Sequence, residues 1–129
     1  QDWLPLIAPT SIPEPAHRSF PKAMEDWDFT RVFNAYADAA ERVKAAGFDG
    51  MELECATHLV AQFLSPGTNK RDDQYGAGSL DNRLRFLREV IASIRARVGT
   101  DIILGVRMVC DEQWQKGLVK DDGVAFARS

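Results

Sequence analysis

Residues 47–86 read GFDGMELECATHLVAQFLSPGTNKRDDQYGAGSLDNRLRF, and this stretch decides the fold. Its first part, residues 51–55, alternates apolar residues with carboxylates, which is typical of a β-strand. An apolar helical segment over residues 58–64 follows and stops at Pro66. A run of mostly charged or polar residues over 68–78 comes next. Because α/β enzymes place their chemistry just past the carboxyl ends of strands, we interpret this run as part of a functional face.

The strand over residues 51–55 has two different sides. Side chains alternate along a strand, so Glu52 and Glu54 share one side while the three apolar residues share the other. A parallel strand buried on both faces is normally apolar throughout, and departures from that rule are expected chiefly at functional sites. The alternative is an edge strand with both carboxylates in water, and the helices expected on either side argue against it.

Two long amphipathic helices flank this stretch. In the first, apolar residues recur every three or four positions between Asp28, a suitable N-cap, and Gly47, which suits a left-handed C-cap. A second helix is expected from a cap at Ser79 to about Arg97, and Gly99 ends it. We expect the charged residues of the second helix to lie mostly on its solvated face, namely Arg83, Arg85, Arg88, Glu89, Arg95 and Arg97.

Residues 102–110 form a nearly unbroken apolar run, which is typical of a strand buried on both faces. Arg107 interrupts this run, and it needs an anionic partner because an unpaired buried guanidinium is strongly unfavourable. A further helix is expected from Asp121. Strand, helix and parallel strand predict an α/β fold, and the long connection favours a TIM-barrel unit with an elaborated active-site loop over a doubly wound sheet.

The composition narrows the range of functions. The chain has 129 residues, of which 27% are charged and 45% hydrophobic, and its net charge is −3. Lys and Arg form no block and no apolar run is long enough to cross a bilayer, so we expect no nucleic-acid or membrane partner. Cys55 and Cys110 lack the spacing of metal ligands, which predicts no metal site and reduced thiols in the cytoplasm.

We expect a single partial domain over residues 1–129. Residues 1–27 hold five of the six prolines, so they are expected to form a loop on the active-site side, with the end of a strand near residues 4–8. Residues 28–129 are expected to carry the β/α units. The last residues, 121–129, begin like a helix that then stops, and the first residues show neither an initiator Met nor a signal peptide. We therefore expect a piece of a larger protein.

About a dozen residue types fall in a specific order along the chain: Gly47–Leu53, Gln62–Pro66, Thr68, Asn69, Arg71, Asp73, Tyr75, Gly76, Gly78, Ser79, Asn82, Arg83, Arg85, Phe86 and Gly105–Arg107. This pattern resembles the NADH:flavin oxidoreductase family of old yellow enzymes. The resemblance covers most of residues 28–128 and implies a (β/α)₈ barrel with FMN at the carboxyl end of the strands. The chain would supply about the fourth and fifth strands with their helices.

The resemblance also points to one branch of the family. Members usually carry a His or Tyr directly after the fourth strand and a His or Asn three residues later, which hold the substrate's oxygen. Here those positions are Glu54 and Thr57, with His58 one step beyond, and the segment is one residue short. This departure, together with the loop at residues 15–21, looks more like the branch that oxidatively removes methyl groups from small amines such as dimethylglycine or N-methylproline. Ala77 is a second departure, inserted into what is usually Tyr-Gly-Gly-Ser.

The resemblance implies roles for individual residues. Arg107 is expected to face flavin N1, where a cation stabilises the negatively charged hydroquinone; the alternative is a structural ion pair with Glu52 or Glu54, and both can hold. Glu54 is expected to be catalytic, either by stabilising iminium character or by selecting a cationic substrate. Thr57 and His58 are expected to bind substrate, and His58 to act as an acid or base. The alternative for His58 is a satisfied side chain at the start of a helix.

The expected function is hydride transfer between FMN and a small organic substrate, with oxidative N-demethylation as the main hypothesis. The first alternative is an ene-reductase of the same family, for which NAD(P)H is the expected electron donor. The second is a non-catalytic barrel fragment, because the phosphate site of such barrels lies near the last two strands. We expect the full-length protein to form a homo-oligomer.

Overall fold

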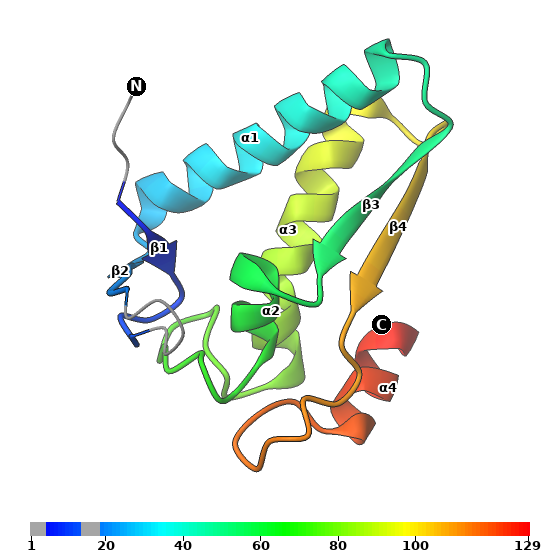
Figure 1. The fold of residues 1–129 in the computed structure, drawn as a ribbon. Helices are drawn as coiled ribbons and strands as arrows, with labels where there is room; N and C mark the ends of the chain where they lie inside the picture. Colours follow the sequence, from blue (N-terminus) through cyan, green and yellow to red (C-terminus); the bar gives the residue numbers. More distant parts are fainter. Residues whose placement is uncertain (1–4, 14–18) are drawn as a thin grey trace.

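The computed structural model describes residues 5–13 and 19–129 (Figure 1). Residues 14–18 lie outside the described residues, so the resemblance over residues 15–21 is not tested by the structure. The elements, in chain order, are β1 (Ile7–Ala8), β2 (Lys22–Ala23), α1 (Asp26–Ala45), β3 (Gly50–Cys55), α2 (His58–Leu64), α3 (Leu80–Val98), β4 (Ile103–Met108) and α4 (Lys120–Arg128).

Strands β3 and β4 lie side by side and run parallel, with α3 connecting them in the chain (Figure 1). Their register places Glu52 opposite Gly105 and Glu54 opposite Arg107. This arrangement confirms the prediction of two parallel strands joined through a helix. Among the described residues, each of the two strands has only the other as its sheet partner, so the chain forms no closed barrel.

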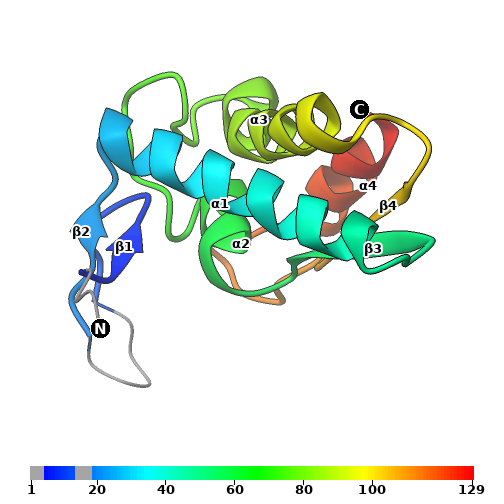
Figure 2. The ribbon, with the colours of Figure 1, turned by 90° about the horizontal axis from the view of Figure 1, so that it is seen from above.

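The helices cover one face of the β3–β4 pair. Helices α1 and α3 pack side by side along much of their length, and α1 and α2 contact β3 (Figure 2). The alternation predicted for the strand is confirmed, because Leu53 and Cys55 are buried toward this helical layer while Glu52 and Glu54 are exposed on the opposite face. No helix in the described parts of the chain is long and apolar enough to span a bilayer.

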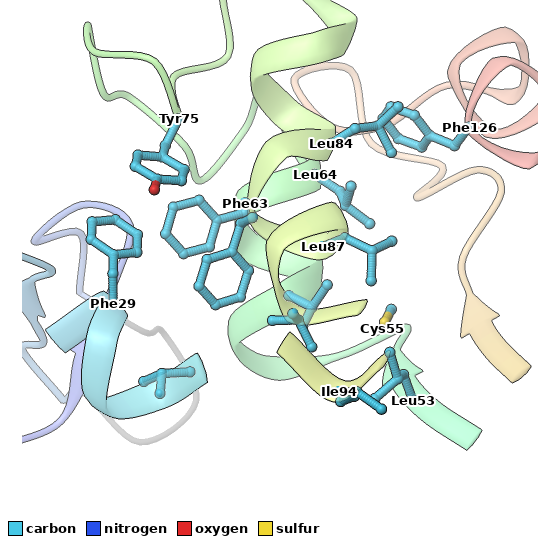
Figure 3. Close-up of a cluster of buried hydrophobic side chains, with 14 of the residues drawn as sticks. Phe29, Leu53, Cys55, Phe63, Leu64, Tyr75, Leu84, Leu87, Ile94 and Phe126 are labelled. Atoms are coloured by element: carbon cyan, nitrogen blue, oxygen red, sulfur yellow. The ribbon is translucent and has the colours of Figure 1, made fainter. Parts of the chain in front are cut away.

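Four aromatic rings hold the core together where α1, α2 and α3 meet (Figure 3). The rings of Phe63 and Phe86 stack with their centroids 4.2 Å apart, and the rings of Phe29 and Tyr75 stack at 4.3 Å. Phe63 and Phe86 have no exposed surface. Because each ring comes from a different segment, this cluster ties the helices to the loop after α2.

The prediction of Asp28 as the N-cap of α1 is wrong. Glu25 is the N-cap and Asp28 is the third helical residue, where it is fully buried. The Asp28 carboxylate accepts a hydrogen bond from the Glu25 backbone N–H (3.0 Å) and one from Lys22 Nζ (2.6 Å). An Asp is favourable both as the N-cap and as the third residue of a helix, where its side chain accepts a hydrogen bond from the N-cap backbone. The sequence pattern alone does not distinguish these two positions.

The predicted C-terminal ends of both long helices and the predicted N-cap of α3 are confirmed. Gly47 follows α1 with φ 80°, a left-handed conformation that glycine adopts without steric cost. The Gly47 and Phe48 amides donate to the carbonyls of Lys44 and Val43, which is the Schellman pattern. Helix α3 is capped by Ser79, whose hydroxyl accepts from a backbone N–H in the first turn, and Gly99 follows its last residue.

Residues 102–110 contain the predicted strand, but the prediction that this strand is buried on both faces is wrong. Ile103 is 70% exposed on the face away from the helices, and Val106 is 39% exposed on the helical face. The physical reason is that β4 is bordered within the described residues only by β3, which leaves its outer edge and much of both faces uncovered. The apolar sequence of β4 suits the interior of a complete barrel, where neighbouring strands and helices cover such a strand.

The described residues before α1 contain two short strands: β1 agrees with the strand end predicted near residues 4–8, whereas β2 lies in a part that was predicted to be loop. Strands β1 and β2 pair in parallel, with Ile7 opposite Lys22 and Ala8 opposite Ala23. Proline 9 is buried next to β1, and β1 contacts α2. This short pairing holds the segment beside the helix that follows β3.

Candidate active site

Glu52, Glu54 and Arg107 form a cluster on the face of the β3–β4 pair away from the helices, here named the strand-face cluster. Arg107 Nε lies 2.8 Å from Glu52 Oε1 and 4.0 Å from Glu54 Oε2. Alternation along the strands and the observed register bring these side chains to one face. The anionic partner predicted for Arg107 is therefore present, and its contact with flavin stays a prediction.

The carboxylate of Glu54 is fixed by the backbone that follows β3. Glu54 Oε1 accepts hydrogen bonds from the amides of Ala56 (2.7 Å) and Thr57 (3.2 Å). These bonds stabilise the turn from β3 into α2, and they orient the other oxygen, Oε2, toward Arg107. Glu54 thus has a structural role that the sequence did not reveal, besides the catalytic role predicted for it.

His58 begins α2 in an unusual backbone conformation. Its φ is 60°, in the left-handed region that residues other than glycine seldom occupy. Thr57, the N-cap of α2, makes no hydrogen bond from its side chain to the helix, and both residues are exposed. Strained backbone of this kind is found preferentially at ligand and active sites, which supports a functional interpretation of His58 over a satisfied helix-start residue.

A pocket of about 840 Å³ lies beside His58, and we name it the side pocket. Its walls come from the N-terminal segment, from α2 and the residues after it, and from the loop after β4. The lining residues are Leu6, Ile7, Ala8, Pro9, Thr10, Ile12, Pro13, Ser19, Pro21, His58, Gln62, Gly67, Thr68 and Trp114. None of them carries a carboxylate, so the side pocket is an apolar chamber with a few polar groups, as small-molecule sites usually are.

The structure separates the predicted site residues into two groups. Glu54 and Arg107 belong to the strand-face cluster, whereas His58 lines the side pocket. The link between the groups is the backbone, since Glu54 binds the amide of Thr57, the residue before His58. Both groups lie at or just beyond the carboxyl end of β3, where α/β barrels place their chemistry.

The interpretation of residues 68–78 as a functional face is largely wrong. Asn69 is fully buried, and its side-chain Nδ2 donates to the carbonyls of Phe63 (2.9 Å) and Tyr75 (2.7 Å). Tyr75 lies in the aromatic core and donates from its hydroxyl to Glu89 (2.7 Å); burial and this carboxylate raise the pKa of Tyr75. These polar side chains satisfy buried backbone and core groups, a need that composition alone does not distinguish from catalysis.

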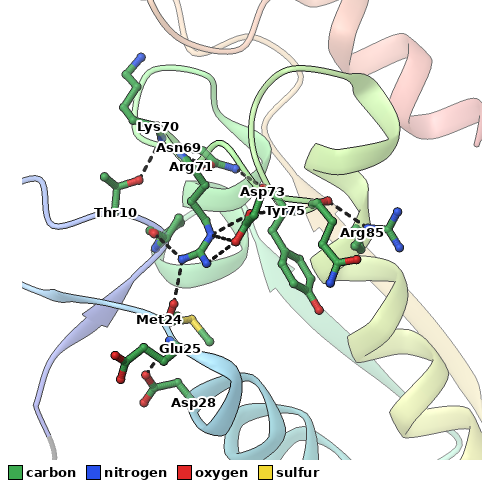
Figure 4. A network of polar contacts seen from close by, with 12 residues as sticks. Thr10, Met24, Glu25, Asp28, Asn69, Lys70, Arg71, Asp73, Tyr75 and Arg85 are labelled. Carbon is green, nitrogen blue, oxygen red and sulfur yellow. Dashed lines mark hydrogen bonds and ion pairs between the residues drawn. The ribbon is translucent and has the colours of Figure 1, made fainter.

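Arg71 joins the same loop to the N-terminal segment (Figure 4). Its Nη1 donates to the carbonyls of Pro9 (2.9 Å) and Met24 (2.8 Å), and its guanidinium lies over the ring of Phe29. Arg71 also pairs with Asp73, and this bond holds the pKa of the Asp73 carboxyl below its usual range. Arg71 therefore fixes one wall of the side pocket against the loop after α2.

The prediction of a mostly solvated charged face on α3 is wrong for Arg83. Arg83 is buried, and its Nη2 lies 2.6 Å from Asp122 Oδ1, while its guanidinium packs over the Phe126 ring. The ion pair holds the pKa of Asp122 below its usual range. This contact attaches α4 to α3, and it could not be read from the helical period alone because Asp122 is distant in sequence.

The two cysteines do not form a redox pair. Cys55 is buried and Cys110 is exposed, and both are free thiols. Burial, with a smaller effect of the Glu54 charge, raises the pKa of the Cys55 thiol to about 12, so it is an unreactive core group. Within residues 5–13 and 19–129, no three His, Cys, Asp or Glu side chains are grouped as metal ligands.

Gln62 and Trp114 of the side pocket were not identified as site residues from the sequence. Gln62 was noted only as part of the family pattern, whereas Thr68 belongs to the run over residues 68–78 that was interpreted as part of a functional face. Trp114 had a usable signal, because it is a large aromatic residue in a polar stretch just past the predicted end of a strand.

The sequence matches the NADH:flavin oxidoreductase / NADH oxidase family over residues 5–128. The chain belongs to this family. It is 54% identical over 127 residues to a Rhizobium meliloti (strain 1021) protein named "Probable N-methylproline demethylase", a match that covers 98% of the chain and 19% of that protein. It is 47% identical over 122 residues to the N,N-dimethylglycine/sarcosine dehydrogenase of Chromohalobacter salexigens, covering 94% of the chain and 17% of that protein.

Among solved structures, the chain resembles a 2-naphthoyl-CoA reductase in complex with 2-naphthoyl-CoA, with a TM-score of 0.87 and 34% sequence identity. The match covers 95% of the chain and 19% of that structure. The chain thus spans about a fifth of the length of these relatives. These findings confirm the predicted family, the predicted fold as part of a TIM barrel, and FMN as the cofactor of the family.

The geometry of Arg107 fits an FMN contact. Its Nε pairs with Glu52 and lies 4.0 Å from Glu54, and its Nη1 and Nη2 have no hydrogen bond to any of the described residues. The side chain is 63% exposed on the open face of the strands. A guanidinium with free donors at this position can bind an anionic flavin edge while its ion pair fixes its direction.

We predict that Asn69→Ala destabilises the full-length protein by about 2–4 kcal/mol, because it leaves two buried carbonyl groups without donors. Thermal unfolding should show a lowered midpoint. The matched control is Gln74→Ala in the same loop, where the side chain is exposed. Equal thermal midpoints for the two variants would contradict the structural role of Asn69 and support its place on a functional face.

We predict that Arg107→Ala in the full-length protein weakens FMN binding by roughly 10- to 100-fold, the equivalent of one charge-assisted hydrogen bond. It should also lower the reduction potential of the bound flavin, since a cation near N1 is removed. Dialysis against FMN and a spectroelectrochemical titration measure the two effects. Arg88→Ala removes an equally charged exposed arginine on α3 and should change neither quantity. An unchanged potential in Arg107→Ala would leave only the structural ion pair with Glu52.

Proposed function

We propose that the full-length protein is an FMN-dependent oxidoreductase that oxidatively removes methyl groups from small N-methylated amines. The observation that carries this proposal is the carboxylate of Glu54 at the end of β3, fixed by two backbone amides and placed 4.0 Å from Arg107. Two relatives named for N-methylproline and for dimethylglycine or sarcosine support the same substrate class.

The chemistry requires a hydride to leave a carbon bonded to nitrogen, which creates iminium character on the substrate. When bound, FMN accepts this hydride with its two electrons, and hydrolysis of the iminium ion releases formaldehyde and the demethylated amine. A carboxylate near the developing positive charge lowers the barrier if it is already oriented. Glu54 meets this condition, because hydrogen bonds from two backbone amides hold its carboxylate in place before the substrate binds.

We assign His58 to the substrate and Arg107 to the cofactor. His58 lines the side pocket, where its imidazole can hydrogen-bond a substrate carboxylate or act as a general acid or base. Thr57 is exposed next to His58, and we assign its hydroxyl as a second substrate contact. Arg107 would stabilise negative charge on the reduced flavin, so the strand-face cluster places a cation and an anion beside one another.

The second candidate is an NAD(P)H-dependent ene-reductase of the same family. The specific observation in its favour is the apolar character of the side pocket, since no carboxylate is among those of its lining residues that the structure describes. The likeness to a 2-naphthoyl-CoA reductase also supports a reductive role. Against it stands Glu54, since a carboxylate repels the enolate-like charge that develops when a hydride adds to an enone.

Anaerobic bleaching of the flavin in the full-length protein separates the two candidates. The proposal predicts that N-methylproline or sarcosine reduces the flavin and releases one formaldehyde per flavin reduced. Rapid reduction by NADPH followed by reoxidation with cyclohexenone, with no bleaching by either methylamine, would refute the demethylase and support the ene-reductase.

We predict that Glu54→Gln slows flavin reduction by the methylamine about 10- to 1000-fold, because it removes a charge that acts in the transition state. The Gln side-chain oxygen can still accept from the amides of Ala56 and Thr57, so the turn should persist. Glu52→Gln is the matched control, since it removes a carboxylate from the same strand face. An equal loss in both variants would assign the effect to the ion pair with Arg107 rather than to Glu54.

We predict that His58→Asn lowers kcat/KM for the methylamine by roughly 100-fold, in the range of general acid–base catalysis, while the thermal midpoint stays near that of the unaltered protein. Asn tolerates the left-handed backbone at this position, so the substitution removes the imidazole without adding strain. A rise in KM alone would indicate carboxylate binding, and loss of a pH dependence near neutrality in kcat would indicate proton transfer. Full activity in His58→Asn would leave His58 as a structural helix-start residue.

A further inference from the structure

The loop after β4 is closed on itself by Glu112. The Glu112 backbone N–H donates to the Leu118 carbonyl (2.9 Å), and the Leu118 N–H donates to Glu112 Oε2 (2.6 Å). Residues 112–118 therefore form a compact loop whose two ends are joined at one carboxylate. We name these residues the β4 loop.

The β4 loop is also bonded to the segment after α2. The buried hydroxyl of Ser65 donates to Glu112 Oε2 (2.6 Å) and accepts from the Gly67 N–H (3.3 Å). Glu112 Oε2 thus accepts one hydrogen bond from within the β4 loop, from the Leu118 N–H, and one from the segment after α2, from the Ser65 hydroxyl. The position of the β4 loop relative to α2 is set by these bonds rather than by surface packing alone.

Trp114 lies at the tip of the β4 loop, directly on Gly67. A Cβ atom placed on Gly67 would lie 2.1 Å from Cζ3 of the Trp114 ring, so any larger residue there would displace the indole. The residue before it, Gln113, has φ 52°, and its N–H donates to Asp111 Oδ1 (2.7 Å). A left-handed turn at Gln113 and the absence of a side chain at Gly67 therefore determine where the indole lies.

The part of the indole that does not touch Gly67 lines the side pocket. Trp114 is 48% exposed, and it is the one aromatic residue among the lining residues that the structure describes. It shares the pocket with His58 and Gln62 of α2. A Trp side chain offers a large rigid surface with few rotatable bonds, which is what a wall that limits ligand size requires.

We infer that Trp114 determines substrate specificity by limiting the size of the group that enters the side pocket beside His58. The inference rests on the proposed function only in the identity of the substrate, since the wall acts on any substrate that uses this pocket. Small N-substituents and side chains fit against the indole, and bulky aryl groups are excluded. Ser65 and Glu112 are positioning residues that hold the wall in place.

The test compares substrates that differ by one phenyl group in the full-length holoenzyme. One pair is N-methylalanine and N-methylphenylalanine, and the other is 3-buten-2-one and 4-phenyl-3-buten-2-one. Trp114→Ala should raise the ratio of kcat/KM for the phenyl compound over the small one by about 10-fold or more, the usual effect of opening an apolar pocket. The dissociation constant of the phenyl compound, measured by calorimetry, should fall relative to that of the small compound. Gln115→Ala, an exposed neighbour that does not line the pocket, should leave the ratio unchanged.

Gly67→Ala supplies an independent variant, because the added methyl group must displace the indole while Trp114 itself is retained. It should shift the ratio in the same direction as Trp114→Ala. If Trp114→Ala does not fold, Trp114→Phe replaces it and should give a smaller shift of the same sign. Turnover of the ketone pair without any turnover of the amine pair would refute the demethylase. The ratio for the ketone pair would still test whether Trp114 limits the size of the substrate. Ratios and dissociation constants within twofold of those of Gln115→Ala would overturn the inference.

Discussion

The parallel, in-register pairing of β3 and β4 is the constraint on which the rest of this structure depends. It places Glu54 opposite Arg107 and directs both side chains to the face that the helices leave open. The same pairing brings the ends of the two strands together, so that the turn into α2 and the β4 loop start side by side. A shift of one residue in β4 would turn Arg107 toward the helices, onto the face that holds Leu53 and Cys55.

The loops beyond these strands are held by polar groups that act within the fold. Asn69 binds backbone carbonyls, Arg71 spans to the N-terminal segment, and Glu112 joins the β4 loop to Ser65. Arg71 and Glu112 bind partners from distant parts of the chain, and Asn69 binds carbonyls six residues away on either side. His58 and Trp114 line the side pocket. Rigid support around a small number of free groups is what allows a site to bind and orient its substrate without reorganisation.

The sequence predicted those parts of the fold that depend on local chemistry. Periodicity and capping identified α1 and α3, with Ser79 and Gly47 at their expected ends, and the alternation in residues 51–55 correctly separated Glu52 and Glu54 from Leu53. The lone Arg107 in an apolar run correctly indicated an anionic partner. These features need only neighbouring residues or one strong electrostatic requirement.

The parts that could not be predicted depend on contacts between distant segments. Asn69 and Arg83 are polar residues whose burial is decided by partners that no local pattern specifies, and they were assigned to a functional face or to solvent. The side pocket combines three separated segments, so the position of Trp114 against Gly67 was not accessible from spacing. The exposure of Ile103 has a different cause, because its sequence suits a complete barrel and this chain supplies only part of one.

The central claim is that the strand-face cluster contacts the flavin while the side pocket receives the substrate. A crystal structure of the full-length protein with FMN and an N-methylated amino acid tests it most directly. The account predicts a guanidinium nitrogen of Arg107 at a hydrogen-bonding distance of about 3 Å from the N1 edge of the flavin, with the amino acid against His58 and Trp114. A flavin bound away from β4, with Arg107 contacting only Glu52 and Glu54, would contradict it.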